Sequence, residues 1–73
     1  MHNETILTCV GRGSHDEHYG GPNGLQMKRE YEGVTPNGNP FGGRWVLRRD
    51  GEYIDVDQYR NDLAERNNIE LVG

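Results

Sequence analysis

The chain has 73 residues, of which 32% are hydrophobic, and it carries a formal net charge of −4 at pH 7. A chain of this length buries only about 60% of its unfolded surface, so the sequence excludes a two-domain enzyme and predicts a single small domain over residues 1–73 with a thin core. The excess of acidic residues disfavours non-specific attraction to nucleic acid or to anionic membranes. We therefore expect a protein partner.

Cysteine content and hydropathy predict the compartment. The single cysteine, Cys9, has no intramolecular disulfide partner, which favours a reducing environment. No stretch approaches the roughly 18 apolar residues of a membrane span. The first ten residues contain Glu4 and lack a basic segment followed by an apolar one, so we expect no signal peptide. Together these features predict a cytoplasmic protein that does not enter the membrane.

The first half of the chain alternates between short strands and glycine-rich segments. Residues 5–10 (TILTCV) are predicted to form a strand that is covered on both sides or lies at the centre of a sheet, because Ile6 and Val10 lie on one face and Leu7 and Cys9 on the other. Residues 25–32 alternate apolar and polar side chains with a period of two, which favours a strand over a helix. Residues 11–24 and 33–43 are rich in glycine, asparagine and proline, and we predict two long, loose loops there.

Residues 44–54 carry the strongest local pattern. Strand-forming residues flank Asp50-Gly51, a pair that favours the type I′ turn of a two-residue hairpin. We therefore predict a β-hairpin whose register places Leu47 opposite Ile54.

A helix and a last strand are predicted to follow the hairpin. Asp55 and Gln58 have the spacing of a capping box, so we expect Asp55 to be the N-cap of a helix that ends near residues 67–68. The apolar stripe of this helix would consist of Val56, Tyr59 and Leu63. Residues 69–72 are then predicted to form a short strand.

These elements predict an α+β fold: a small, mostly antiparallel β-sheet with one α-helix in the C-terminal half and long glycine-rich loops. The predicted core consists of Ile6, Val10, Met27, Trp45, Leu47, Ile54, Val56, Tyr59, Leu63, Ile69 and Leu71.

Candidates for metal binding and catalysis are few. His15 and His18, with Cys9 and His2, could supply the four ligands of a zinc site. Paired cysteines at close spacing are absent, so we interpret the two central histidines as a solvated loop tip and predict no metal and no cofactor. Cys9 lies in an apolar strand and is interpreted as a small buried hydrophobe. No catalytic or phosphate-binding motif occurs, so we expect no enzyme; a small zinc-binding domain remains an alternative.

Charge is unevenly distributed along the chain. Residues 44–49 contain three arginines and no acid, whereas residues 50–73 contain seven acids and two arginines. Arginine and aromatic side chains are favoured at the centres of protein interfaces. The predicted partner-binding residues, beside an exposed edge of the N-terminal strand, are Arg12, Tyr19, Arg44 and Arg48. The alternative is that Arg44 and Arg48 are ordinary exposed strand residues.

A small acidic domain with two glycine-rich segments and no cofactor or catalytic motif resembles the small host-takeover proteins of lytic bacteriophages, in particular the RNA polymerase inhibitors with antitermination activity of Xanthomonas phages. The resemblance implies a protein that binds the large subunits of the host's bacterial RNA polymerase, inhibits initiation and promotes antitermination. It further implies a monomer in the host cytoplasm.

Two other classes share this composition. An acidic DNA mimic that inhibits a bacterial defence nuclease, as anti-CRISPR and anti-restriction proteins do, would use helix acids such as Asp62 and Glu65 for recognition. The start (TILTCV) and the end (NNIELV) of the chain are also similar to small bacterial domains of unknown function.

Overall fold

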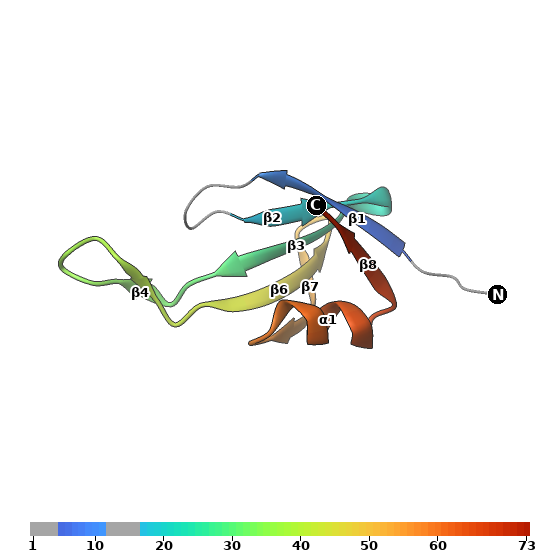
Figure 1. The fold of residues 1–73 in the computed structure, drawn as a ribbon. Coiled ribbons are helices and arrows are strands. Elements are labelled where there is room, and N and C mark those ends of the chain that lie inside the picture. The colour runs from blue at the N-terminus through green and yellow to red at the C-terminus, as the bar shows by residue number, and fades with distance from the viewer. Residues whose placement is uncertain (1–4, 12–16) are drawn as a thin grey trace.

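The computed structural model describes residues 5–11 and 17–73, which form a curled sheet with one α-helix lying across its open side (Figure 1). In chain order the elements are β1 (Thr5–Gly11), β2 (His18–Gly20), the 3-10 turn η1 (Pro22–Gly24), β3 (Leu25–Glu30), β4 (Gly33–Val34), β5 (Pro40–Phe41), β6 (Arg44–Arg49), β7 (Glu52–Asp57), α1 (Arg60–Arg66) and β8 (Ile69–Val72).

The main sheet has six strands in the order β7-β6-β3-β2-β1-β8. β8 is parallel to β1, whereas the other neighbouring strands are antiparallel. The sheet is therefore mixed, and its parallel β1–β8 pairing is a feature that the sequence did not predict. The cause is the connection: the chain leaves β7 at one edge, passes through α1 and enters the opposite edge beside β1. The broader prediction, a small α+β protein with one α-helix, agrees with the structure.

The core lies between the inner face of the sheet and α1. It consists of Leu7, Tyr19, Leu25, Met27, Trp45, Leu47, Leu63, Ala64 and Ile69. In β1 the inward residue is Leu7, which is fully buried, whereas Ile6 is 51% and Val10 63% exposed. The prediction that Ile6 and Val10 belong to the core is therefore wrong, because the strand turns its other face, with Leu7 and Cys9, toward the core. Ile54 and Tyr59, also predicted in the core, are exposed as well.

The β6–β7 hairpin confirms the predicted turn, because Asp50 and Gly51 both have positive φ. Beyond the turn the register shifts, and Leu47 lies opposite Asp55 rather than opposite Ile54. An extra residue in β7 produces a bulge, which locally re-aims the strand's side chains. The predicted Leu47–Ile54 pair is therefore wrong, and Ile54 is left exposed.

The two segments predicted as loose loops contain ordered structure where they are described. Strands β4 and β5 pair as a second, two-stranded sheet, and with their turn they form an arm that extends from β3 and β6 (Figure 1). A Cβ atom on Gly33 would come within 2.9 Å of the Phe41 ring, so glycine lets the two strands of the arm pack closely. In the other segment, β2 pairs with both β1 and β3, which makes it an interior strand.

The helix begins later than predicted. Asp55 lies in β7, and its carboxylate accepts hydrogen bonds from Arg66 Nε at 3.0 Å and Asn67 Nδ2 at 2.9 Å. It is therefore not an N-cap, and the predicted capping box with Gln58 does not form. Arg66 Nη1 also donates to Asp57 Oδ2 at 2.8 Å. These bonds attach the C-terminal turn of α1 to β7 and keep residues 55–57 extended.

The N-terminal turn of α1 is attached to the segment around β2. Arg60 Nη1 donates to Glu17 Oε2 at 2.7 Å and to the Tyr19 hydroxyl at 2.9 Å. The Tyr19 hydroxyl donates to the same Glu17 oxygen at 2.7 Å. Burial and this hydrogen bond to Glu17 raise the pKa of Tyr19 above its usual value. The three side chains thus join α1 to the middle of the sheet.

The inward face of β1 can be tested by paired substitutions. Leu7→Ala should lower the free energy of unfolding by about 2–5 kcal/mol, because it leaves a cavity in the core. Ile6→Ala, in the same strand but half exposed, should change it by less than about 1 kcal/mol. Chemical denaturation of both variants measures the difference, and equal losses would contradict the assignment of Leu7 to the core.

The attachment of α1 to β7 predicts acid sensitivity. The hydrogen bonds from Arg66 and Asn67 lower the pKa of Asp55 to about 2, from a usual value of 3.8. Because the folded state favours the carboxylate, its stabilising contribution is complete above the usual pKa and is lost as the pH falls toward about 2. We expect the free energy of unfolding to decrease from about pH 4 to 2, and to decrease less steeply in Arg66→Gln. Denaturation curves at a series of pH values measure both slopes, and identical slopes would contradict the contact.

Candidate functional site

The outer face of the sheet, on the side away from α1, carries a groove with a volume of about 270 Å³. Trp45 and Leu47 of β6 point into the core, so the alternating residues of that strand point outward. We call this feature the outer groove; it is lined by Glu30, Tyr31, Arg44, Val46, Arg48, Tyr53 and Val56. These residues come from β3, β6, β7 and the start of the arm.

The middle of the outer groove is apolar. Val46 lies opposite Val56 in the β6–β7 ladder, and Val46 is buried although it points away from the core. Tyr53 lies opposite Arg48 and is 55% exposed. An exposed aromatic ring beside a small apolar floor is a surface on which a protein side chain can be buried.

Two arginines on the same strand flank this apolar region, and each has an acidic partner. Arg48 donates from Nε to Glu30 Oε2 at 3.0 Å and from Nη2 to Glu30 Oε1 at 3.3 Å, a two-point contact. These hydrogen bonds lower the pKa of Glu30 below its usual value. Arg44 Nη2 lies 3.0 Å from Glu32 Oε1. The guanidinium groups are therefore held in place and their charge is largely balanced.

The predicted binding residues are only partly brought together. Arg44 and Arg48 lie in the outer groove. Tyr19 is only 4% exposed and packs against Trp45, with ring centroids 6.1 Å apart, so it is not an exposed anchor. Arg12 lies outside the described residues. The predicted free edge of the N-terminal strand is also wrong, because β1 lies between β2 and β8.

Sequence reasoning missed the residues that complete the groove. Tyr53 could have been included, because the hairpin register next to the Asp50-Gly51 turn already places it opposite Arg48. The Glu30–Arg48 contact depends on the pairing of β3 with β6, and no local pattern in the sequence identifies that pairing. Val56 was assigned to a helix stripe, and the extended conformation of β7 places it in the groove instead.

Other kinds of site find little support in the described part of the chain. Within residues 5–11 and 17–73, no group of three or more histidine, cysteine, aspartate or glutamate side chains is placed to hold a metal ion. His2 and His15 lie outside those ranges. The Cys9 thiol, which is partly buried, donates to the Gly11 carbonyl at 3.5 Å. The same residues contain no helix that is long and apolar enough to span a membrane.

No family model, curated protein or solved structure matches this chain. The basis for a functional proposal is therefore the geometry and chemistry of its own surface. Of the predicted binding residues that are described, those on the surface lie in the outer groove.

Proposed function

We propose that the chain is a regulator that acts by stoichiometric binding to a protein through the outer groove. The observation that carries this proposal is the combination of an apolar floor, an exposed tyrosine and two arginines whose charge is already balanced by Glu30 and Glu32. Tyrosine and arginine are enriched among the residues that dominate protein–protein affinity. A surface with balanced charge attracts the phosphates of nucleic acid only weakly.

We further propose bacterial RNA polymerase as the partner, on the strength of the resemblance to phage host-takeover proteins. A segment of a large polymerase subunit would place oxygen acceptors on the remaining N–H groups of Arg44 and Arg48, while an apolar side chain of that segment would lie against Tyr53 and Val46. Hydrogen bonds from the two fixed guanidinium groups orient such a contact, and the buried aromatic ring supplies affinity. The regulator would inhibit initiation and promote antitermination as a monomer in the host cytoplasm, without a cofactor or catalysis.

Substitutions in the outer groove test this proposal. Tyr53→Ala, and the double charge reversal of Arg44 and Arg48 to glutamate, should each weaken binding by about 1–3 kcal/mol. The matched control is Tyr59→Ala, because Tyr59 is 63% exposed but does not line the groove; it should change binding by less than about 0.5 kcal/mol. Affinity for purified bacterial RNA polymerase, at two salt concentrations, is the measurement.

Two results would contradict the proposal in different ways. Equal losses from Tyr53→Ala and Tyr59→Ala would exclude the outer groove as the contact surface. Absence of binding to the polymerase would exclude that partner. The DNA-mimic alternative predicts binding to a defence nuclease. It would be supported if Asp62→Lys weakened that binding more than the reversal of Arg44 and Arg48 did.

A further inference from the structure

The two edge strands of the six-stranded sheet, β7 and β8, differ in whether side chains bind their outward backbone groups. At the β7 edge the N–H of Val56 donates to Asp55 Oδ1 at 2.8 Å, and its carbonyl accepts a bond from Arg66 Nη2 at 3.0 Å. Both backbone groups are therefore occupied by side chains. Such occupation prevents another strand from pairing there, and proteins commonly protect exposed strand edges in this way.

The β8 edge has no such protection. The N–H of Thr5 donates to the Asn68 carbonyl at 2.9 Å, and Thr5 lies beside Ile69 in the parallel β1–β8 ladder. This register directs the backbone groups of residues 68, 70 and 72 toward β1 and those of Ile69 and Leu71 away from it. Among the described residues, no hydrogen bond reaches the outward N–H and carbonyl groups of Ile69 and Leu71. They form a short, open row of donors and acceptors.

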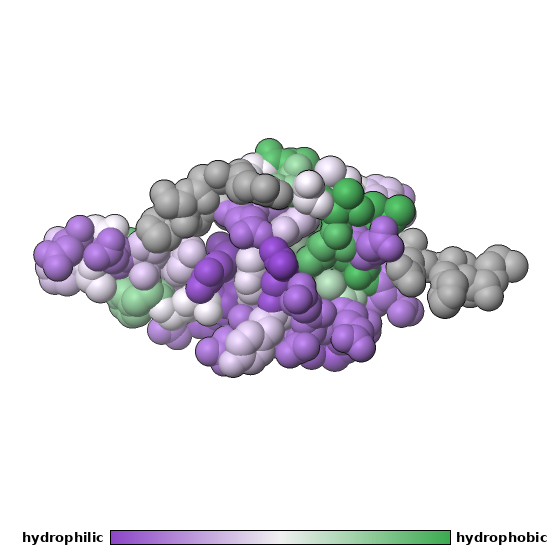
Figure 2. Space-filling view, viewed as in Figure 1, coloured by the Kyte–Doolittle hydropathy of each residue, from purple (hydrophilic) through white to green (hydrophobic). Residues whose placement is uncertain are grey.

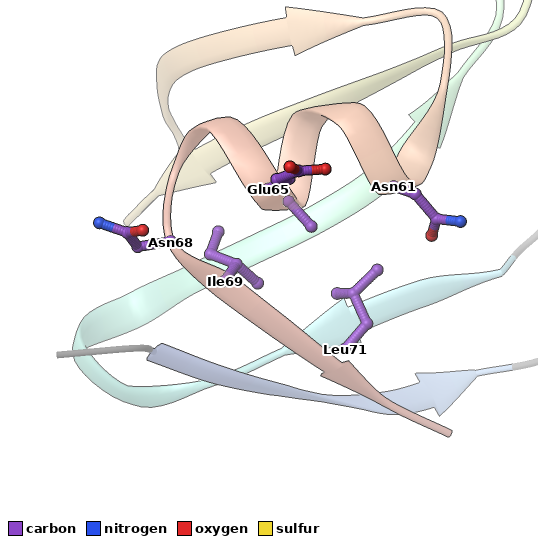
Figure 3. A pocket seen from close by; sticks show the side chains of 6 residues that line it. Asn61, Glu65, Asn68, Ile69 and Leu71 are labelled. Atoms are coloured by element: carbon purple, nitrogen blue, oxygen red, sulfur yellow. The ribbon is translucent and has the colours of Figure 1, made fainter. Parts of the chain in front are cut away.

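Apolar surface lies on both sides of this open edge. On the inner side a hollow of about 340 Å³ separates β8 from α1, and Ile69 and Leu71 point across it toward the helix (Figure 3). Hydrophobic side chains also gather on the surface around β1 and β8 (Figure 2). The exposed ones among them are Ile6, Val10 and Val72. An added strand could bury apolar side chains on either of its faces.

The charge around the β8 edge determines which kind of segment can bind there. Glu65 lines the hollow, Glu70 lies in β8, and Asp62 lies on the same helix as Glu65, and no ion pair from the described residues compensates them. The two arginines of this region, Arg60 and Arg66, are already bound to other acids. A second copy of the chain would bring the same acids to the contact. A basic segment complements them.

We propose that the β8 edge binds an extended, basic segment of a partner protein, which adds to the six-stranded sheet as a further strand. The backbone of the segment pairs with Ile69 and Leu71, and its apolar side chains enter the hollow beside α1. Its lysine or arginine side chains point to the opposite face and meet Glu70 of β8. This surface is separate from the outer groove.

Short capped peptides of defined sequence test the proposal. A peptide of alternating valine and lysine should bind, and the amide protons of Ile69 and Leu71 should become protected from hydrogen exchange, as measured by NMR. The same peptide with glutamate in place of lysine should bind at least about tenfold more weakly, because like charges would meet at the edge. Equal binding of the two peptides, or unchanged exchange at Ile69 and Leu71, would overturn the proposal.

Three variants of the full chain separate strand addition from general charge attraction. Glu70→Lys should weaken binding of the lysine peptide by about fivefold, whereas Glu52→Lys, the same charge change at the β6–β7 turn, should leave it unchanged. Leu71→Pro should abolish binding, because it removes an N–H that faces the edge and makes no bond to β1. If this variant does not fold, the comparison of Glu70→Lys with Glu52→Lys still decides the question.

Two other outcomes would also reject the proposal. Equal weakening by Glu70→Lys and Glu52→Lys would show attraction to net charge alone. Protection of Ile69 and Leu71 in the free protein, with a dimeric mass in solution, would assign the edge to a second copy. The experiment uses no polymerase, so its failure leaves the outer-groove proposal standing.

Discussion

Arg60 and Arg66 attach a short helix to two parts of the sheet that are far apart in the chain. α1 has seven residues, which is too few for a helix to be stable alone, and it contributes only Leu63 and Ala64 to the core. Arg60 reaches Glu17 and Tyr19, and Arg66 reaches β7. These contacts hold the helix over the open side of the curled sheet. Without them the inner face would be exposed, because the small number of apolar residues leaves little else to cover it.

The same two arginines determine how charge is distributed over the surface. Each neutralises acids that lie near the helix, and within residues 5–11 and 17–73 Glu65 and Glu70 beside β8 have no ion-pair partner. On the outer face Arg44 and Arg48 of β6 are balanced by Glu32 and Glu30. Arg66 also occupies the Val56 carbonyl, so the contact that fixes the helix also protects the β7 edge.

Local patterns in the sequence predicted an element correctly where the backbone conformation of a few neighbouring residues determines it. Asp50-Gly51 marked the hairpin, because both residues adopt positive φ there. The capping box at Asp55 failed because its carboxylate is bound by Arg66, eleven residues later, and local spacing does not contain that information. The inward face of β1 was undetermined because both of its faces are apolar. The neighbouring strands place Leu7 in the core, and their order depends on where α1 returns the chain to the sheet.

In the candidate site, too, local sequence predicted some features and distant contacts determined the others. The period of two along β6 was enough to place Arg44 and Arg48 on one face. The acids that balance them come from β3 and the start of the arm, and only the β3–β6 pairing brings them there. Tyr19 stands among glycines, which suggested exposure, yet its strand lies in the interior of the sheet and its ring lies in the core.

The outer groove and the β8 edge differ in the chemistry they can bind. The groove offers an apolar floor and an aromatic ring beside two charge-balanced arginines, which suit a largely neutral segment, whereas the edge offers free backbone groups within an acidic rim. One short segment does not suit both surfaces, because the lysines that complement the acidic edge have no excess negative charge to meet in the groove. If both surfaces are used, the protein must contact two different segments. It would then act as a connector between two parts of a partner or between two partners, a role that requires a rigid fold and no catalytic residue.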